Sequence, residues 1–283
     1  MRRLLLCLLA ACHPAPAVTR GDAQPIALTY TGVAGWQIES AGKIILVDPY
    51  FSRPALAGVI ESDPAAVAAH APKHADLIVV GHSHVDHLLD TPAVAIASGA
   101  QVMGSASTIA VASAKNVPAR KLVPVRGGED YQFDGFSVRV IPSLHSALDD
   151  KHFAQGVPIT VIPPVRFDDY TDGGTFDYLV RVGGHEVFVS STANFVEREL
   201  VGVHPDIAII ATGLRGEVTD YTCRLMRLLG NPPVVYPTHF DDWKSPPQDE
   251  PIDDDLAAFI REVHSCSPRT QVIVPKHFER MVR

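Results

Sequence analysis

Four side chains of metal-binding type stand within six residues, directly after a short apolar segment. The segment 77–80 is typical of a buried strand, and His82, His84, Asp86 and His87 follow it. Imidazole and carboxylate groups together suit zinc or a similar divalent metal. In an extended chain His82 and His84 project to the same side and can grip one ion. Asp86 and His87 can reach a second ion at the spacing that two-metal hydrolases use. The sequence therefore predicts a metal centre at this strand end; the alternative is a polar loop that is merely rich in His.

Strand-like and helix-like segments follow one another in the same order in both halves of the chain. No linker divides the halves, so we expect one domain built from two packed α/β halves. A long irregular stretch, 146–175, is expected to form a lid over the site. The expected strands are 26–30, 35–39, 44–47, 77–80, 101–103, 136–141, 178–182, 186–190, 206–211, 234–236 and 271–274. The expected helices are 64–70, 91–99, 107–115, 220–229 and 254–264.

The amino-acid composition limits the kinds of molecule that this protein can bind. The chain has 283 residues, of which 46% are hydrophobic and 20% charged, so disorder and coiled coil are excluded. The formal net charge is -8, with no basic block. Nucleic-acid binding depends on neutralising phosphates, so we expect a small-molecule substrate and no nucleic acid.

The first residues have the pattern of an export signal. Arg2 and Arg3 precede the apolar run 4–11, and Leu9-Ala10-Ala11-Cys12 resembles the lipobox of bacterial lipoproteins. We expect an exported protein, periplasmic or membrane-anchored, that touches the membrane only through a lipidated Cys12. Cleavage after Ala17 and a cytosolic tail remain as alternatives. The expected organisation is a signal peptide at 1–11, a tether at 12–25 and the folded domain at 26–283.

Two cysteines lie in expected C-terminal helices. Cys223 and Cys266 can pair in an oxidising compartment, or they can remain two buried free thiols. Spacing alone says nothing about the geometry that a disulfide needs. Of the two interpretations, we favour two buried free thiols.

The pattern His-x-His-x-Asp-His at 82–87 resembles the signature of the metallo-β-lactamase superfamily, and further motifs agree in order. Asp48 ends an early strand, His145 follows the strand at 136–141, and His239 follows the strand at 234–236. The resemblance implies a four-layer αββα sandwich with its site at one edge. Taken alone, His145 and His239 would more often be hydrogen-bonded core residues. The short segments Tyr30-Thr31-Gly32 and Val47-Asp48-Pro49 are similar to those of one branch of the superfamily. That branch includes ascorbate-phosphate lactonases and N-acyl-phosphatidylethanolamine phospholipases.

The resemblance also implies roles for these residues. Asp48 would orient a ligating His, although it could simply cap the turn before Pro49. Asp86 would have a catalytic part, orienting the nucleophile and relaying its proton. Zinc-bound hydroxide would attack an ester, lactone or phosphodiester bond. The implied ligands are His82, His84 and His145 for a first zinc ion, and Asp86, His87 and His239 for a second.

The fourth family motif differs in this chain. Where relatives commonly have a metal-bridging Asp, the sequence has Ser190-Ser191-Thr192. Ser191 offers only a hydroxyl or a hydrogen bond to bound water, so the second zinc ion is expected to bind more weakly. A non-catalytic zinc-binding envelope lipoprotein, a degenerate hydrolase, is therefore the alternative function.

Three further residues are candidates for substrate binding. Arg215 and Lys244 follow strand ends and could hold an anionic group, and Trp243 could supply an apolar wall. For each of these three residues, the alternative to substrate binding is a side chain that is simply exposed to solvent. The scattered histidines, His277 among them, are expected to be surface or capping residues. His152 is the possible exception, because it lies in the long loop.

Overall fold

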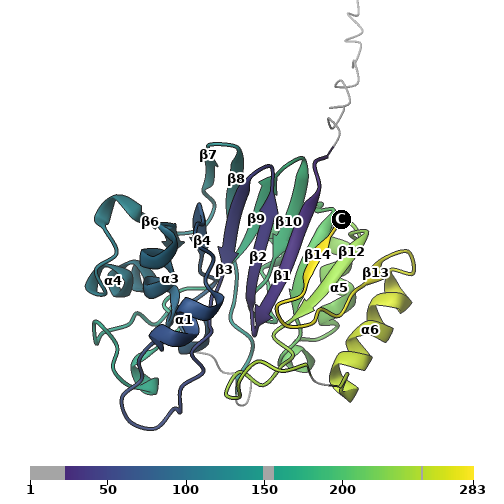
Figure 1. The fold of residues 1–283 in the computed structure, drawn as a ribbon. Helices are drawn as coiled ribbons and strands as arrows, with labels where there is room; N and C mark the ends of the chain where they lie inside the picture. Colours follow the sequence, from purple (N-terminus) through teal and green to yellow (C-terminus); the bar gives the residue numbers. More distant parts are fainter. Residues whose placement is uncertain (1–22, 149–155, 250) are drawn as a thin grey trace, which may run out of the picture.

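Two seven-stranded sheets pack face to face, with helices on both outer faces (Figure 1). The structure, a computed structural model, describes residues 23–148, 156–249 and 251–283. The layers are helix, sheet, sheet and helix, so the expected four-layer sandwich of two α/β halves is confirmed.

The first sheet contains the N-terminal half and the last strand of the chain. Its strands from β14 to β3 are antiparallel, and those from β3 to β6 are parallel. Helices α1 (Pro64–His70), α3 (Thr91–Ser98) and α4 (Ala106–Ala114) cover its outer face. The order of strands is β14 (Arg280–Val282), β1 (Ile26–Gly32), β2 (Gly35–Ser40), β3 (Lys43–Val47), β4 (Leu77–Val79), β5 (Gln101–Gly104) and β6 (Leu122–Pro124).

The second sheet repeats this plan. Its strands from β7 to β10 are antiparallel, and those from β10 to β13 are parallel. Helices α5 (Tyr221–Leu228) and α6 (Asp254–Cys266) cover its outer face. The order of strands is β7 (Asp130–Phe133), β8 (Phe136–Pro142), β9 (Phe176–Val182), β10 (His185–Val189), β11 (Ile207–Ala211), β12 (Val234–Thr238) and β13 (Gln271–Val272).

Local signals explain where several helices begin and end. The Asp63 side chain accepts a hydrogen bond from the amide of Ala65, and Pro64 opens α1. Asp253 caps α6 in the same way, through the amide of Leu256. Gly99 ends α3 in the left-handed conformation that glycine adopts without strain.

Three apolar clusters fill the spaces between the layers. The central one lies between the sheets and includes Tyr30, Trp36, Tyr178 and Tyr236, while the other two lie beneath the helices on each side. The Tyr178 hydroxyl donates to the carbonyl of Val80 at 2.7 Å, which ties the second sheet to the His-rich loop. Packing from both sheets therefore holds the segment that carries the predicted ligands.

The sequence reading missed three strands and one short helix. Strands β6 and β7 are short and only partly buried, so they lack the apolar pattern of a core strand. Strand β14 pairs with β1 from the opposite end of the chain, a contact that no local pattern encodes. The four-residue helix α2 (Val85–Leu88) lies inside the His-rich segment, so Asp86 and His87 are helical.

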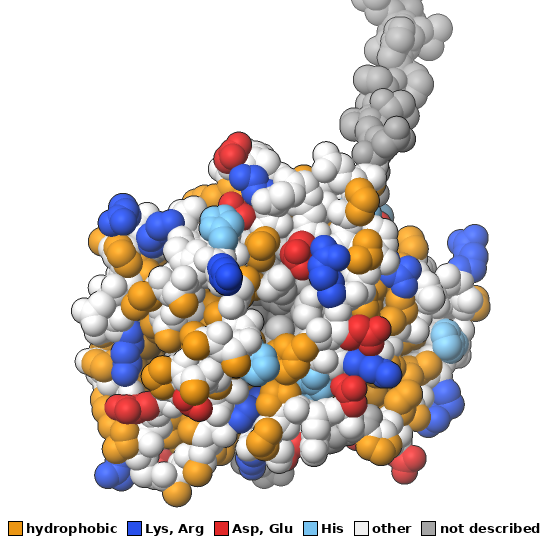
Figure 2. Space-filling model, viewed as in Figure 1, with side chains coloured by type: hydrophobic (Ala, Val, Ile, Leu, Met, Phe, Trp, Pro, Cys, Tyr) orange, Lys and Arg blue, Asp and Glu red, His pale blue; other side chains and the backbone are white. Residues whose placement is uncertain are grey.

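The expectation of free thiols is wrong, because Cys223 and Cys266 form a disulfide between α5 and α6, with their Cα atoms 5.7 Å apart. Cys12 and His152 lie outside the described residues. In the part of the chain that the structure describes, no helix is long and apolar enough to span a membrane. On the face shown in Figure 2, described side chains of both charges are interspersed with apolar ones.

Candidate metal centre

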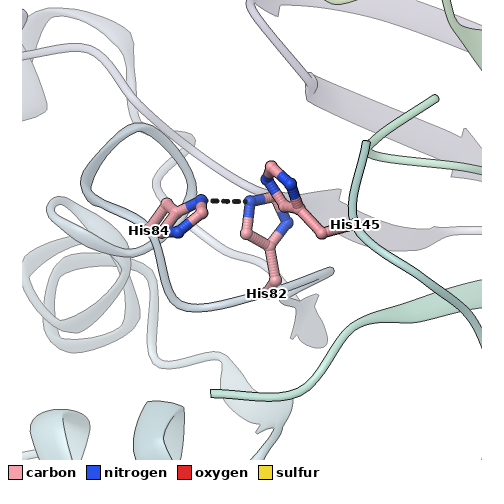
Figure 3. Close-up of side chains that lie close together, drawn as sticks. All are labelled: His82, His84 and His145. Atoms are coloured by element: carbon pink, nitrogen blue, oxygen red, sulfur yellow. Dashed lines mark hydrogen bonds between the residues drawn. The ribbon is translucent and has the colours of Figure 1, made fainter. Parts of the chain in front are cut away.

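Three histidines from two loops meet at one end of the sandwich. His82 and His84 lie between β4 and α2, and His145 lies after β8. Nε2 of His82 is 3.0 Å from Nδ1 of His84, and the rings of both lie 4.7 Å, centre to centre, from the ring of His145 (Figure 3). Nδ1 of His145 donates to the carbonyl of Ser146, so Nε2 is the nitrogen that could bind a metal. We call His82, His84 and His145 the first cluster.

A second cluster lies beside the first and consists of Asp86, His87 and His239. Oδ2 of Asp86 is 3.4 Å from Nε2 of His87 and 3.4 Å from Nε2 of His239. His239 follows β12 with a φ of 55°, the left-handed region that non-glycine residues rarely adopt. In each cluster the three ligand atoms lie within 4.8 Å of one another.

The histidines of the first cluster are neutral, which is the form that binds metal. Burial lowers the pKa of His84 to about 4, with the His145 ring beside it acting in the same direction. Burial and the neighbouring rings also hold the pKa of His82 well below its usual value. Burial likewise lowers the pKa of His145. No proton therefore competes with a metal ion at this cluster near neutral pH.

Asp48 holds His87 in place. The Asp48 carboxylate accepts a hydrogen bond from the amide of Gly81 at 2.7 Å and one from Nδ1 of His87 at 2.8 Å. The hydrogen bond to Asp48 directs the other ring nitrogen of His87, Nε2, toward Asp86. Burial would lower the pKa of His87, but the Asp86 and Asp48 carboxylates raise it to about 10. The structure thus places Asp48 in the orienting position that the resemblance implies.

The residues present fit a divalent metal. Five imidazoles and one carboxylate converge, a donor set that suits zinc and its neighbours. Nε2 of His87 is buried and, although it lies 3.4 Å from the Asp86 carboxylate, makes no hydrogen bond among the described residues. A buried polar nitrogen without a partner is costly unless a ligand satisfies it.

Ser191 lies behind the clusters. Its hydroxyl is buried, packs against Gly81 near Asp48, and makes no hydrogen bond within the described residues. Thr192, not Ser191, lines the pocket. Both polar atoms of the Asn194 amide have partners, since its Nδ2 donates to the carbonyl of His145 and its Oδ1 accepts from the amide of Phe195. Ser191 therefore lies behind the clusters, where it offers a hydroxyl group and no carboxylate.

The expected role of Arg215 is corrected. Its side chain is buried and turned toward α6, where it forms ion pairs with Asp255 and Glu262. A guanidinium held by two carboxylates has no free face for an anionic substrate. Lys244 is exposed, does not line the pocket, and lies over the Trp243 ring at 5.1 Å. Of these three candidates, only Trp243 lines the pocket.

A buried network fixes the loop that follows His239. The Asp241 carboxylate accepts hydrogen bonds from the Tyr30 hydroxyl at 2.7 Å and from Arg53 at 3.1 Å, and lies 3.1 Å from Nε2 of His277. The His277 side chain is 6% exposed and pairs with Asp241, so His277 is a half-buried residue and not the exposed surface residue that was expected. No sequence pattern pointed to Asp241, because its partners come from distant segments.

Both clusters open into one pocket of about 420 Å³. The long irregular stretch borders it, as expected of a lid, and supplies residues that the sequence reading did not single out. Among the residues lining the pocket besides the six ligands are Val85, Leu148, Phe167, Asp168, Tyr170, Leu214 and Trp243.

Comparisons with known proteins agree with this geometry. A family model described as the beta-lactamase superfamily domain matches residues 27–162. A UPF0173 metal-dependent hydrolase of Carboxydothermus hydrogenoformans is 29% identical over 219 residues, which cover 76% of this chain and 85% of that relative. A relative of the same name from Pyrobaculum calidifontis is 31% identical over 121 residues, 42% of this chain and 51% of its own length.

A solved structure shares the fold over most of the chain. Igni18, a metallo hydrolase from Ignicoccus hospitalis, has a TM-score of 0.64 at 20% identity, and the match covers 92% of this chain and 98% of that chain. The sandwich, the two clusters and the match of residues 27–162 together show the fold and the site pattern of the metallo-β-lactamase superfamily. Within this class it is a metal-dependent hydrolase, as its relatives are named. The narrower resemblance to the lactonase and phospholipase branch stays a prediction.

Proposed function

We propose that the chain is a zinc-dependent hydrolase that cleaves an ester, lactone or phosphodiester bond in a small molecule. The observation that supports this most is the opening of two three-residue clusters into one pocket. A bound zinc ion supplies an activated water and polarises the bond to be cleaved. The donor set favours zinc over magnesium or calcium, since those ions prefer oxygen ligands.

Asp86 is the pocket residue placed to orient a water and take its proton. Its carboxylate lies between the rings of His87 and His239. Burial raises the pKa of Asp86, but these two rings lower it well below its usual range, so the carboxylate is ionised. An ionised carboxylate accepts a hydrogen bond from a water within this reach, and it could take the proton of a water that a bound metal ion would make more acidic.

A metal-loaded activity screen tests the proposal. Full-length protein loaded with zinc is offered ester, lactone, phosphodiester and β-lactam substrates. We expect turnover of at least one ester, lactone or phosphodiester, loss of turnover on chelation, and recovery on addition of zinc. His82→Ala should abolish the activity, whereas His264→Ala, an exposed His on α6, should retain it.

The second candidate is a non-catalytic zinc-binding envelope lipoprotein. The observation that favours it is Ser191, which stands at the position where the family resemblance implies a bridging carboxylate. Stoichiometric zinc at both clusters without turnover of any substrate in the screen would support this candidate over the hydrolase.

We also propose that the chain is exported and is either periplasmic or anchored by a lipid on Cys12. The disulfide between Cys223 and Cys266 supports an oxidising compartment. Mass spectrometry of the native N-terminus tests this proposal and should find an acylated Cys12. An unprocessed Met1 in a cytosolic fraction would contradict export.

A further inference from the structure

The walls of the pocket differ in chemistry from its floor. The floor carries the six ligands, whereas the walls are mainly apolar and aromatic: Val85, Leu148, Phe167, Tyr170, Leu214 and Trp243. Several of these side chains are partly open to solvent, with exposed fractions of 42% for Leu148, 40% for Phe167 and 52% for Leu214. Apolar surface that borders a pocket gains free energy when a ligand covers it.

Two aromatic rings form the centre of this wall. The rings of Phe167 and Trp243 stack with their centres 6.0 Å apart and their planes at 20°. Phe167 comes from the long irregular loop, and Trp243 comes from the loop after β12 that Asp241 and Arg53 fasten. Leu214 has a φ of 64°, a strained conformation for a leucine, in the loop after β11 on the pocket wall. Three separate loops thus contribute to one apolar surface.

Two carboxylates line the pocket, while Lys244 lies over the Trp243 ring at 5.1 Å and is not among the lining residues. Asp168 lines the pocket beside Phe167, and Asp86 lies at the floor. No Lys or Arg lines the pocket in the described part of the chain. The nearby Arg53 is bonded to Asp241 and to the carbonyls of Asp242 and Ser245. An anionic substituent that extends past the clusters to Asp168 would meet its negative charge, whereas an anion at the floor would meet the bound metal ions.

We propose that the pocket selects an uncharged carboxylic ester or lactone whose alkyl or aryl substituent packs on Phe167 and Trp243. The proposal rests on the hydrolase function proposed above and narrows its substrate class to uncharged substrates with an apolar substituent. The scissile carbonyl lies over the clusters, and the substituent extends along the apolar wall. Substrate recognition then comes from burial of apolar surface, and Asp168 disfavours substrates with a negative substituent.

Kinetics of the zinc-loaded protein test the substrate class. Lactones with alkyl chains of increasing length should show kcat/KM rising by about fourfold per methylene until the wall is covered. Bis(p-nitrophenyl) phosphate should be a poor substrate. Phe167→Ala and Trp243→Ala should flatten the dependence on chain length. Phe278→Ala is the matched control, because that ring has a similar exposure of 37% and lies outside the pocket.

The charge of Asp168 allows a second kinetic test of the substrate class. Asp168→Asn should raise kcat/KM for an ester that carries a carboxylate by about fivefold relative to its uncharged counterpart, since one charge at about 4 Å in water contributes about 1 kcal/mol. Equal efficiency for anionic and neutral substrates, no dependence on chain length, or a preference for the phosphodiester would each overturn the proposal while leaving the hydrolase function intact.

A binding measurement separates failure of the substrate class from failure of the hydrolase function. An alkyl-substituted cyclic ketone resembles a lactone but cannot be hydrolysed, and its binding can be followed by fluorescence of Trp243. The other tryptophan, Trp36, is buried between the sheets. Binding that strengthens with chain length and is lost in Phe167→Ala supports the apolar site, even if no substrate is turned over. Absence of this binding in an active enzyme overturns it.

Discussion

The two clusters share one pocket but differ in charge. The first cluster consists of three buried imidazoles, which burial keeps neutral, and contains no carboxylate. The second contains the ionised Asp86, and Asp48 stands behind its His87. These two carboxylates raise the pKa of His87 to about 10, so the metal-free second cluster holds a proton that a metal must displace.

From this difference we expect that more negative charge does not by itself make the tighter site. The first cluster offers its nitrogens without a competing proton. The second offers a carboxylate but pairs it with His87, and Ser191 brings no further negative charge to offset the repulsion between two metal ions. We therefore expect unequal affinities, with the tighter ion at His82, His84 and His145.

The largest expected effect comes from removing a ligand of the first cluster. His145→Ala should lower kcat/KM by more than about a hundredfold, because loss of an orienting neighbour alone costs about 10–100-fold. The bound metal, measured by elemental analysis, should fall with it. Unchanged activity with one metal still bound would show that the second cluster works alone.

The two clusters should also differ in how metal affinity depends on pH. Between pH 6 and 9, which is below the pKa of about 10 for His87, each metal ion bound at the second cluster releases a proton. Its affinity should therefore rise by about tenfold per pH unit.

The first cluster should show no such rise, because its histidines are already neutral, with a pKa of about 4 for His84. Metal titration by calorimetry in buffers of different ionisation enthalpy measures the protons released. Equal proton release at both ions would remove the distinction between the clusters.

Asp48 should affect one cluster only. Asp48→Asn keeps the size of the side chain but weakens the hold on Nδ1 of His87. We expect the affinity of the second metal to fall by about 10–100-fold while the first stays unchanged. Competition with a chelator of known affinity measures both constants. Equal weakening of the two metals would show that Asp48 supports the whole loop through the amide of Gly81.

The smallest expected effect is at Ser191. Ser191→Asp should tighten the second metal by about tenfold, as one added negative charge near the pair contributes about 1.4 kcal/mol. Ser191→Asn, of equal size and without charge, is the matched control. Weaker binding of both ions in Ser191→Asp would show that the new carboxylate repels Asp48 and does not face the metals.

Much of the fold and the ligand set could be predicted because their signals are local. The alternation of apolar segments located most strands, and the pair Asp63-Pro64 is a local signal for the start of α1. His82, His84, Asp86 and His87 stand within six residues, and their order along the chain carries the family resemblance. His145 and His239 were found only through that resemblance, because a single histidine after a strand is not distinctive.

The substrate-facing surface was decided by the tertiary structure. Arg215 follows a strand end in sequence, but its direction depends on α6, which brings Asp255 and Glu262 against it. The disulfide depends on the same packing of α5 on α6.

By itself, the sequence determined which atoms can bind metal and at which strand ends they stand, since both depend on neighbours a few residues away. Only the tertiary structure decided that Phe167 and Trp243 form one wall, that β14 closes on β1, and that Asp241 anchors the loop of His239. These contacts join segments far apart in the chain, and they follow from how whole layers pack, which no local periodicity records.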